Sequence, residues 1–132
     1  MFKKIFIVDD DAVSIFLTEA ILAMEQIASE YSTFSSAKEA LMVLTQSMDG
    51  TSAEPLPQLI LLDLNMPVMS GWDMLEALLP YEQQLLGQVE VLILTSSVDE
   101  QEIKRATEYK LVTDFLQKPL DEGAIRKLKK LD

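Results

Sequence analysis

Short apolar runs alternate along the chain with longer amphipathic stretches, and this alternation predicts its strands and helices. Continuous runs of Ile, Leu, Val and Phe are typical of strands that are buried on both faces. Apolar residues spaced three and four positions apart are typical of helices that cover a sheet. The expected strands span 5–8, 27–34, 59–62, 91–94 and 112–117, and the expected helices span 36–47, 71–86, 99–109, 12–25 and 121–132.

Proline, serine and the spacing of apolar residues refine these elements. The segment 27–34 is polar enough to lie at a sheet edge, and Ser35 or Ser36 can cap the helix that follows it. Pro80 should kink the third helix or end its first part, because proline lacks the amide hydrogen that a helix interior needs. Residues 12–25 carry apolar side chains at the spacing of a core-facing helix surface: Val13, Phe16, Leu17, Ala20, Ile21 and Met24.

Strands that alternate with helices predict an α/β fold, in which helices cover both faces of a parallel sheet. The carboxyl ends of parallel strands meet at one edge, and open α/β sheets bind ligands at that edge. Polar residues follow four of the five predicted strands, so a single pocket can gather them from distant parts of the chain. These residues are Asp9, Asp10, Asp11, Asp63, Thr95 and Lys118.

Some of these polar residues also have an ordinary structural explanation. Asp11 is well placed to cap the helix that begins at Ala12. Thr95 can simply end a strand, and Lys118 can be a solvated lysine beside a turn. Singly they indicate little, but together they bring acids, a hydroxyl and a cation to one edge of the sheet.

The carboxylates among them favour a metal site. Clustered carboxylates repel one another, and a bound cation can compensate for this repulsion. Asp9, Asp10 and Asp63 offer oxygen ligands, which Mg²⁺ prefers, and Mg²⁺ sites in proteins often include phosphate oxygens. A lysine opposite the metal would meet such a phosphate as a point charge. The group therefore predicts Mg²⁺-dependent phosphoryl chemistry.

The composition excludes several other kinds of site. The chain has no cysteine and no histidine, which excludes disulfides, Ser-His-Asp triads and the usual zinc sites. Its formal net charge of −11 argues against nucleic acid or an anionic membrane as a direct ligand. No apolar run approaches the roughly 20 residues that span a bilayer, and the first residues do not resemble a signal peptide, so we expect a cytoplasmic protein.

A series of motifs along essentially the whole chain resembles the response-regulator receiver domain of two-component signalling. The motifs are IFIVDDD at 5–11, LLDLNMPVMSGW at 61–72, VLILTSS at 91–97 and FLQKP at 115–119. The resemblance implies a flavodoxin-like, doubly wound sheet of five parallel strands in the order 2-1-3-4-5. It also implies one chemotaxis-regulator-like receiver domain over 1–132, with no covalent output domain.

The resemblance implies that Asp63 accepts a phosphoryl group from a phosphohistidine. The donor would be a sensor histidine kinase or a histidine phosphotransfer protein. Lys118 would bind the phosphoryl group, and the Lys118–Pro119 peptide bond would be cis. Mg²⁺ would be held by Asp9, Asp10, Asp63 and the backbone carbonyl of Asn65.

The same resemblance assigns roles to the residues that would read and remove the phosphoryl group. Thr95 and Phe115 would act together as a switch. Asn65 and Ser97 would lie near the path of the hydrolytic water and tune the lifetime of the phosphorylated state. The chain would catalyse only its own phosphorylation and dephosphorylation, and would signal to a protein target through the helix 99–109, the fifth strand and the last helix.

Two other classes of protein share part of this pattern. A Mg²⁺-dependent phosphatase of the haloacid dehalogenase type also has a nucleophilic aspartate after a strand, but needs a second aspartate where Asn65 stands. A flavodoxin-like cofactor binder needs a phosphate loop rich in Ser, Thr and Gly where this chain has three aspartates. Within the receiver family, Ser70 replaces a common aspartate, and 108–114 replaces a stretch usually rich in Gly and Ala.

Overall fold

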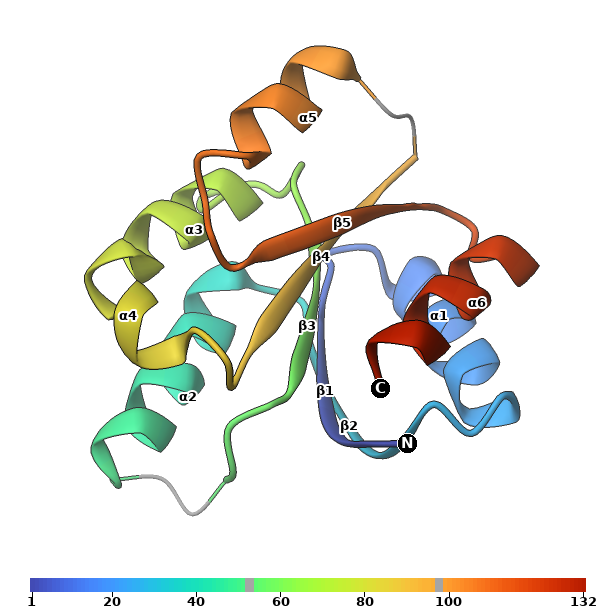
Figure 1. The fold of residues 1–132 in the computed structure, drawn as a ribbon, viewed down its shortest axis with the longest axis horizontal. Coiled ribbons are helices and arrows are strands. Elements are labelled where there is room, and N and C mark those ends of the chain that lie inside the picture. The colour runs from blue at the N-terminus through green and yellow to red at the C-terminus, as the bar shows by residue number, and fades with distance from the viewer. Residues whose placement is uncertain (52–53, 97–98) are drawn as a thin grey trace.

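The computed structural model describes residues 1–51, 54–96 and 99–132, and it contains a parallel sheet between two layers of helices (Figure 1). The strands are β1 (Phe2–Val8), β2 (Ala28–Phe34), β3 (Leu59–Asp63), β4 (Glu90–Thr95) and β5 (Val112–Gln117). The helices are α1 (Ala12–Met24), α2 (Ala37–Asp49), α3 (Gly71–Leu78), α4 (Glu82–Leu85), α5 (Glu100–Ala106) and α6 (Glu122–Leu131), with a 3₁₀ turn η1 (Leu79–Tyr81). The strand order is β2-β1-β3-β4-β5, which confirms the predicted topology.

The central strands β1 and β3 are apolar because helices cover both of their faces. All five residues of β3 are buried, and so are the last four residues of β1. The two strands pair in parallel with Val8 opposite Leu62, so Asp9 and Asp63 lie next to each other at the carboxyl edge. The polar strand β2 lies at one side of the sheet, as its composition predicts.

Successive side chains of each strand point to opposite faces and so build two separate cores. Helices α2 and α3 lie on one face of the sheet and α1 and α6 on the other (Figure 1). The first core includes Phe6, Leu44, Ile60, Met74 and Ile93. The second includes Ile5, Leu22, Leu59, Leu92 and Leu128.

Two of the predicted helices differ in length from the structure. Pro80 divides the expected helix 71–86 into α3, the turn η1 and α4, in agreement with the predicted kink. The expected helix 99–109 is shorter, because α5 ends at Ala106. The hydroxyl of Thr107 donates to the carbonyl of Lys104 (2.6 Å), a local bond that competes with continuation of the helix.

The apolar spacing predicted the wrong inner face for α1. Val13, Phe16, Leu17 and Met24 are 66%, 71%, 52% and 77% exposed, whereas Thr18 and Leu22 are buried. Helix α1 is apolar on most of its surface, so residue spacing alone could not identify the side that faces the sheet. The inward row also includes the polar residue Thr18, so this row is not continuously apolar in the sequence.

The exposed side of α1 borders a groove of about 670 Å³ that reaches the carboxyl edge of the sheet. Val13, Leu17 and Ile21 line it along the helix, and Lys118 and Pro119 line it from the other side. Exposed apolar patches of this kind are typical of surfaces that bind other molecules.

Helix α5 is attached to α3 by an aromatic and polar contact. The guanidinium of Arg105 lies 4.3 Å from the ring centroid of Trp72, and the ring of Tyr109 lies 6.0 Å from that of Trp72. The hydroxyl of Tyr109 donates to the carboxylate of Glu76 at 2.7 Å. The start of α3, which follows the Asp63 loop, is thereby linked to α5.

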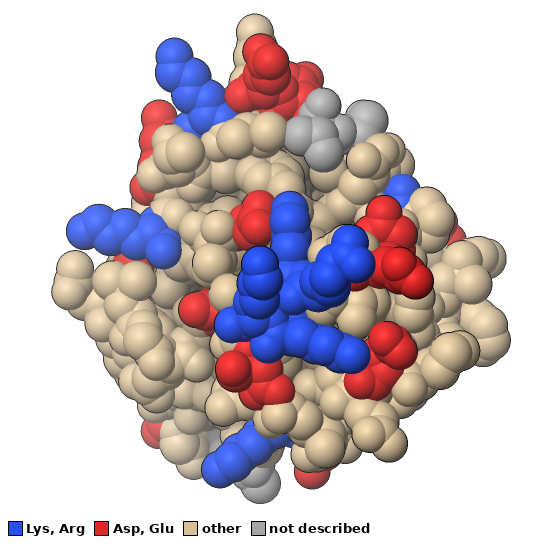
Figure 2. Space-filling model, turned by 45° about the vertical axis from the view of Figure 1, so that its right-hand side comes forward, with Lys and Arg blue, Asp and Glu red and all other residues tan. Residues whose placement is uncertain are grey.

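Helix α6 carries four of the 11 lysines and arginines of the chain. Figure 2 shows basic side chains gathered at the centre of one face, with acidic side chains around them. Two of the lysines of α6 pair with acids of other elements: Lys127 with Asp114 (3.4 Å) and Lys129 with Glu25 (3.7 Å). Among the described residues, no helix is long and apolar enough to cross a membrane.

The two leucines of α1 provide a test of its orientation. Leu22→Ala removes a side chain with no exposed surface and should lower the free energy of unfolding by about 2 to 5 kcal/mol. Leu17→Ala makes the same change on the exposed side and should cost roughly 0.5 kcal/mol or less. Urea denaturation measures both values, and equal losses would contradict the observed orientation.

Candidate functional site

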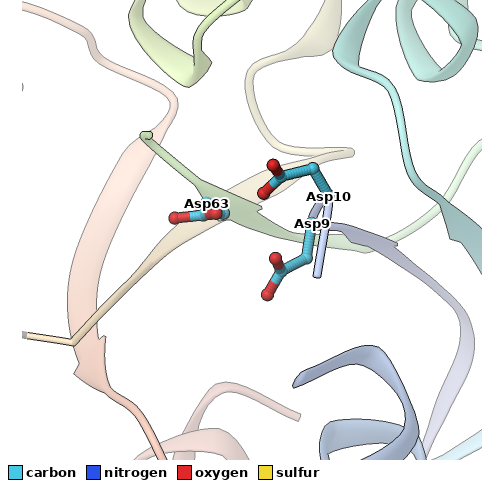
Figure 3. A group of neighbouring side chains, drawn as sticks. All are labelled: Asp9, Asp10 and Asp63. Carbon is cyan, nitrogen blue, oxygen red and sulfur yellow. The ribbon is translucent and has the colours of Figure 1, made fainter. Parts of the chain in front are cut away.

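Three carboxylates converge at the carboxyl edge of the sheet. Asp9 and Asp10 follow β1, and Asp63 ends β3. One carboxylate oxygen from each residue lies within 4.8 Å of the other two, and the three side chains extend into a shared space (Figure 3). Asp9 and Asp63 are buried and Asp10 is exposed, so the cluster opens to solvent on the side of Asp10.

Within the described ranges of the chain, three hydrogen-bond donors hold Asp9. Its Oδ1 accepts from the backbone N–H of Asp11 (3.0 Å), and its Oδ2 accepts from the hydroxyl of Ser14 (2.6 Å) and from Nζ of Lys118 (2.9 Å). Burial acts to raise the pKa of Asp9, but these bonds outweigh it and hold the pKa below its ordinary value. Asp9 is therefore a fixed negative charge in the floor of the site.

Asp63 has an environment of the opposite kind. Burial raises the pKa of its carboxyl to about 6, although the positive charge of Lys118 opposes this rise. The negative charge of Asp9 also contributes to this raised value. The backbone N–H of Asn65 is a long donor to Asp63 Oδ1 (3.4 Å), and Lys118 Nζ lies 3.9 Å from the same oxygen. A positive charge placed beside Asp63 would therefore favour its ionised form.

Lys118 is positioned between the two buried carboxylates by the end of β5. Its backbone N–H donates to the carbonyl of Thr95 (2.7 Å), which joins the ends of β4 and β5, and the Lys118–Pro119 peptide bond is cis, as the resemblance implied. Thr95 is buried at the end of β4. Phe115 is half-buried on β5 and packs against the core that contains Ile93.

The loop from Asp63 to α3 depends on one close backbone approach. A Cβ on Gly71 would lie 2.5 Å from the carbonyl oxygen of Asp63, so only glycine fits there without a shift of that carbonyl. Within the loop, the Met69 N–H donates to the Pro67 carbonyl (2.8 Å) around Val68, whose φ is 68°. This left-handed backbone is unfavourable for a β-branched residue, so the loop contains local strain.

Two of the polar residues near the site, Asp11 and Ser70, cap helices. Asp11 caps α1 through the N–H of Val13 (3.0 Å), as predicted. Ser70, which departs from the family pattern, caps α3 in a capping box with Asp73. Asn65 is exposed directly after the site, and the prediction for Ser97 lies outside the described residues.

Sequence reasoning did not identify Ser14 as a site residue. It lies on α1, and the hydrogen bond of its hydroxyl to Asp9 is the shortest of the three that Asp9 accepts. A serine in the first turn of a helix is common, so no sequence signal separated it from other polar residues there.

The donor set of this site fits a hard divalent cation. Three carboxylates supply oxygen ligands only, and their mutual repulsion decreases when a cation lies between them. Asp10 and Asp63 are the better direct ligands, because Asp9 already accepts three hydrogen bonds. The residues present thus fit Mg²⁺.

Comparison with protein families identifies the family to which this fold belongs. The sequence profile of the response regulator receiver domain matches residues 5–130. The chain belongs to this family. No curated protein sequence is significantly similar to the chain.

Solved structures of receiver domains are similar to the whole chain. A two-component response regulator from Cytophaga hutchinsonii has 25% sequence identity and a TM-score of 0.87, covering 98% of this chain and 96% of its own. The receiver domain of the histidine kinase CKI1 from Arabidopsis thaliana, complexed with Mg²⁺ and BeF₃⁻, has 25% identity and a TM-score of 0.74, covering 97% and 90%. A CheY-like receiver domain protein from Methanospirillum hungatei JF-1 has 25% identity and a TM-score of 0.70, covering 98% and 93%.

These matches confirm the resemblance found in the motifs and favour it over the phosphatase and flavin-binding alternatives. The protein is a receiver domain of two-component signalling, and receiver domains are signalling modules that interact with histidine kinases or phosphotransfer proteins. Receiver domains bind Mg²⁺ at an acidic pocket, and this receiver has a cluster of three carboxylates, Asp9, Asp10 and Asp63, at the carboxyl edge of its sheet.

The raised pKa of Asp63 predicts a pH dependence of stability in the metal-free receiver. The folded state binds a proton at Asp63 up to about pH 6, whereas the unfolded chain releases it near the ordinary pKa of 3.8. The contribution of Asp63 to stability therefore falls as pH rises from about 4 to about 6, and it is constant above that. Asp63→Asn should be more stable than the wild type by on the order of 2 to 3 kcal/mol at pH 7, and this difference should vanish near pH 4.

Urea unfolding in EDTA at pH 4, 5, 6 and 7 measures this difference for both proteins. If the difference in stability is the same at all four pH values, the pKa of Asp63 is not raised in the folded protein.

Proposed function

We propose that this receiver accepts a phosphoryl group on Asp63 from a phosphohistidine donor, in a reaction that depends on Mg²⁺. The observation that carries the proposal is the position of Asp63: a buried carboxylate with a lysine ammonium 3.9 Å away and two further carboxylates beside it. The carboxylate supplies a nucleophile, the lysine supplies a positive charge, and the other acids supply metal ligands.

The transfer forms one bond and breaks one. An oxygen of ionised Asp63 attacks the phosphorus atom, the phosphorus–nitrogen bond of the phosphohistidine breaks, and its electron pair returns to the imidazole. Bound Mg²⁺ would neutralise the oxygens of the phosphoryl group and favour the ionised form of Asp63. Asp9, Asp10, Asp63 and the backbone carbonyl of Asn65 would hold the metal, with Asp10 and Asp63 as the direct carboxylate ligands, because Asp9 already accepts three hydrogen bonds.

Lys118 would change partner during this reaction. In the structure its ammonium binds Asp9 at 2.9 Å and lies 3.9 Å from Asp63. A phosphoryl group on Asp63 presents acceptor oxygens on the side of this ammonium, and a charge-assisted bond to them is short and strong. The lysine would thus stabilise the phosphorylated form.

Loss of the phosphoryl group would occur by attack of water on phosphorus. Asn65 is exposed beside the site, is small and polar, and would neither block the water nor act as its base. Ser97, outside the described residues, has the second such position by family resemblance. We therefore propose a phosphorylated state of intermediate lifetime.

Thr95 and Phe115 would transmit the change to the surface. The hydroxyl of Thr95 would donate a hydrogen bond to a phosphoryl oxygen. Phe115 is half-buried on β5, two residues before the residue that pairs with Thr95, and its ring would move inward behind the threonine. This would alter the surface of α5, β5 and α6, through which the receiver would contact its target. Action without a covalent output domain stays a prediction.

Substitution of Thr95 tests this switch. Beryllofluoride, a phosphoryl mimic, should still bind Thr95→Ala near Asp63, but the amide shifts that it induces over 100–120 should shrink. Loss of one hydrogen bond to a charged acceptor, about 1.5 to 3 kcal/mol, changes a two-state population roughly tenfold or more. Thr113→Ala, an exposed threonine of β5, is the matched control and should keep the full shifts. Full-size distal shifts in Thr95→Ala would exclude Thr95 as the coupling residue.

Phosphorylation by acetyl phosphate tests the main proposal. With Mg²⁺, mass spectrometry should find one added phosphoryl group, and borohydride reduction should convert the modified aspartate at position 63 to homoserine. Asp63→Asn should stay unmodified, and so should the wild type in EDTA. Rapid turnover of a generic phosphate ester without a stable adduct would instead favour the phosphatase alternative.

The neighbouring aspartates Asp10 and Asp11 separate an effect of metal ligation from an effect of overall negative charge. Mg²⁺ should raise the unfolding midpoint of the wild type by mass action. Asp10→Asn should lose most of this increase, because Asp10 belongs to the carboxylate cluster. Asp11→Asn makes the same charge change outside the cluster, retains a good helix cap, and should keep it. An unchanged response in Asp10→Asn would contradict the assignment of Asp10 as a ligand.

A further inference from the structure

Ser14 connects α1 to the most deeply buried carboxylate of the site. Its hydroxyl donates to Asp9 Oδ2 at 2.6 Å. The cap of α1 does not need this hydroxyl, since Asp11 already caps the helix through the N–H of Val13. The side chain of Ser14 is therefore directed at the site rather than at its own helix.

Ser14 and Lys118 bind the same oxygen of Asp9. Lys118 Nζ lies 2.9 Å from Asp9 Oδ2, and the third donor, the N–H of Asp11, binds the other oxygen, Oδ1. If Lys118 leaves, Ser14 is the one donor among the described residues that still binds Oδ2. Hydrogen bonds offset the cost of removing a carboxylate from water. A buried carboxylate that loses a donor without replacement therefore loses part of this stabilisation.

The next step rests on the proposed function, in which Lys118 moves from Asp9 to a phosphoryl group on Asp63. The movement exchanges one charge-assisted bond for another, so its free energy depends on how well Asp9 is satisfied afterwards. With Ser14, Asp9 keeps a donor on each oxygen. Without Ser14, Lys118 would be the last side-chain donor to Asp9 from the described part of the chain and would be retained there.

We propose that Ser14 is a positioning residue whose hydroxyl holds Asp9 in place and thereby frees Lys118 to bind the phosphoryl group. It touches neither the reacting atoms nor the phosphoryl group, and it acts through Asp9. The role requires a hydroxyl at this position of α1, so threonine should replace serine and alanine should not.

Separate measurements of Mg²⁺ and beryllofluoride test this role. With Mg²⁺ alone, Lys118 stays on Asp9, so Ser14→Ala should change the Mg²⁺ dissociation constant by less than about threefold. With Mg²⁺ and beryllofluoride, Lys118 must transfer, so Ser14→Ala should weaken beryllofluoride binding roughly tenfold, as for loss of a hydrogen bond to a charged group. Titrations followed by amide shifts give both constants.

Two variants serve as controls. Ser14→Thr keeps the hydroxyl and should retain the beryllofluoride affinity of the wild type. Val13→Ala changes the neighbouring exposed side chain of α1 and should also retain it. Alanine has a higher helix propensity than serine, so Ser14→Ala should fold, and its melting temperature checks this.

The outcomes separate this inference from the proposed function. Equal weakening of Mg²⁺ and beryllofluoride in Ser14→Ala would mean that Ser14 only shapes the metal site, and unchanged binding of both would mean that it has no role; either result overturns the inference. Weakening in Ser14→Thr as large as in Ser14→Ala would exclude the hydroxyl as the active group. Failure of the wild type to bind beryllofluoride with Mg²⁺ would overturn the proposed function itself.

Discussion

The rest of the site depends on the ion pair between Lys118 and Asp9. It joins the end of β5 to the end of β1 across the edge of the sheet, and it neutralises one of two buried carboxylates. Asp63 is left with a lysine at 3.9 Å and with a carboxyl whose pKa is raised to about 6, chiefly by burial. The receiver thus has one carboxylate that is fixed as an anion and one whose charge responds to what lies beside it.

Much of the fold and the centre of the site could be predicted from the sequence, because each rests on strong local signals. Continuous apolar runs identified the central strands, and their alternation with helices gave the parallel sheet. Since parallel strands end at one edge, Asp9, Asp63 and Lys118 could be brought together although 109 residues separate the first from the last. Pro80 also predicted the position at which the third helix is interrupted.

The remaining features arise from contacts that single-sequence patterns do not contain. The inner face of α1 could not be predicted because its outer face is equally apolar, and because the inward row includes Thr18. Ser14 resembles any polar residue in the first turn of a helix until its distance to Asp9 is known. The early end of α5 coincides with a local hydrogen bond from the Thr107 hydroxyl to the carbonyl of Lys104, which residue spacing does not reveal.

The contact between α3 and α5 gives this receiver an internal optical probe. Trp72 is the single tryptophan of the chain, and its indole lies between α3 and α5 with a guanidinium over its ring. Indole emission responds to nearby charge and to exposure to water, so a change in the separation of the two helices would alter the fluorescence of the unlabelled protein. Conformational events at the surface can therefore be followed in real time without an added dye.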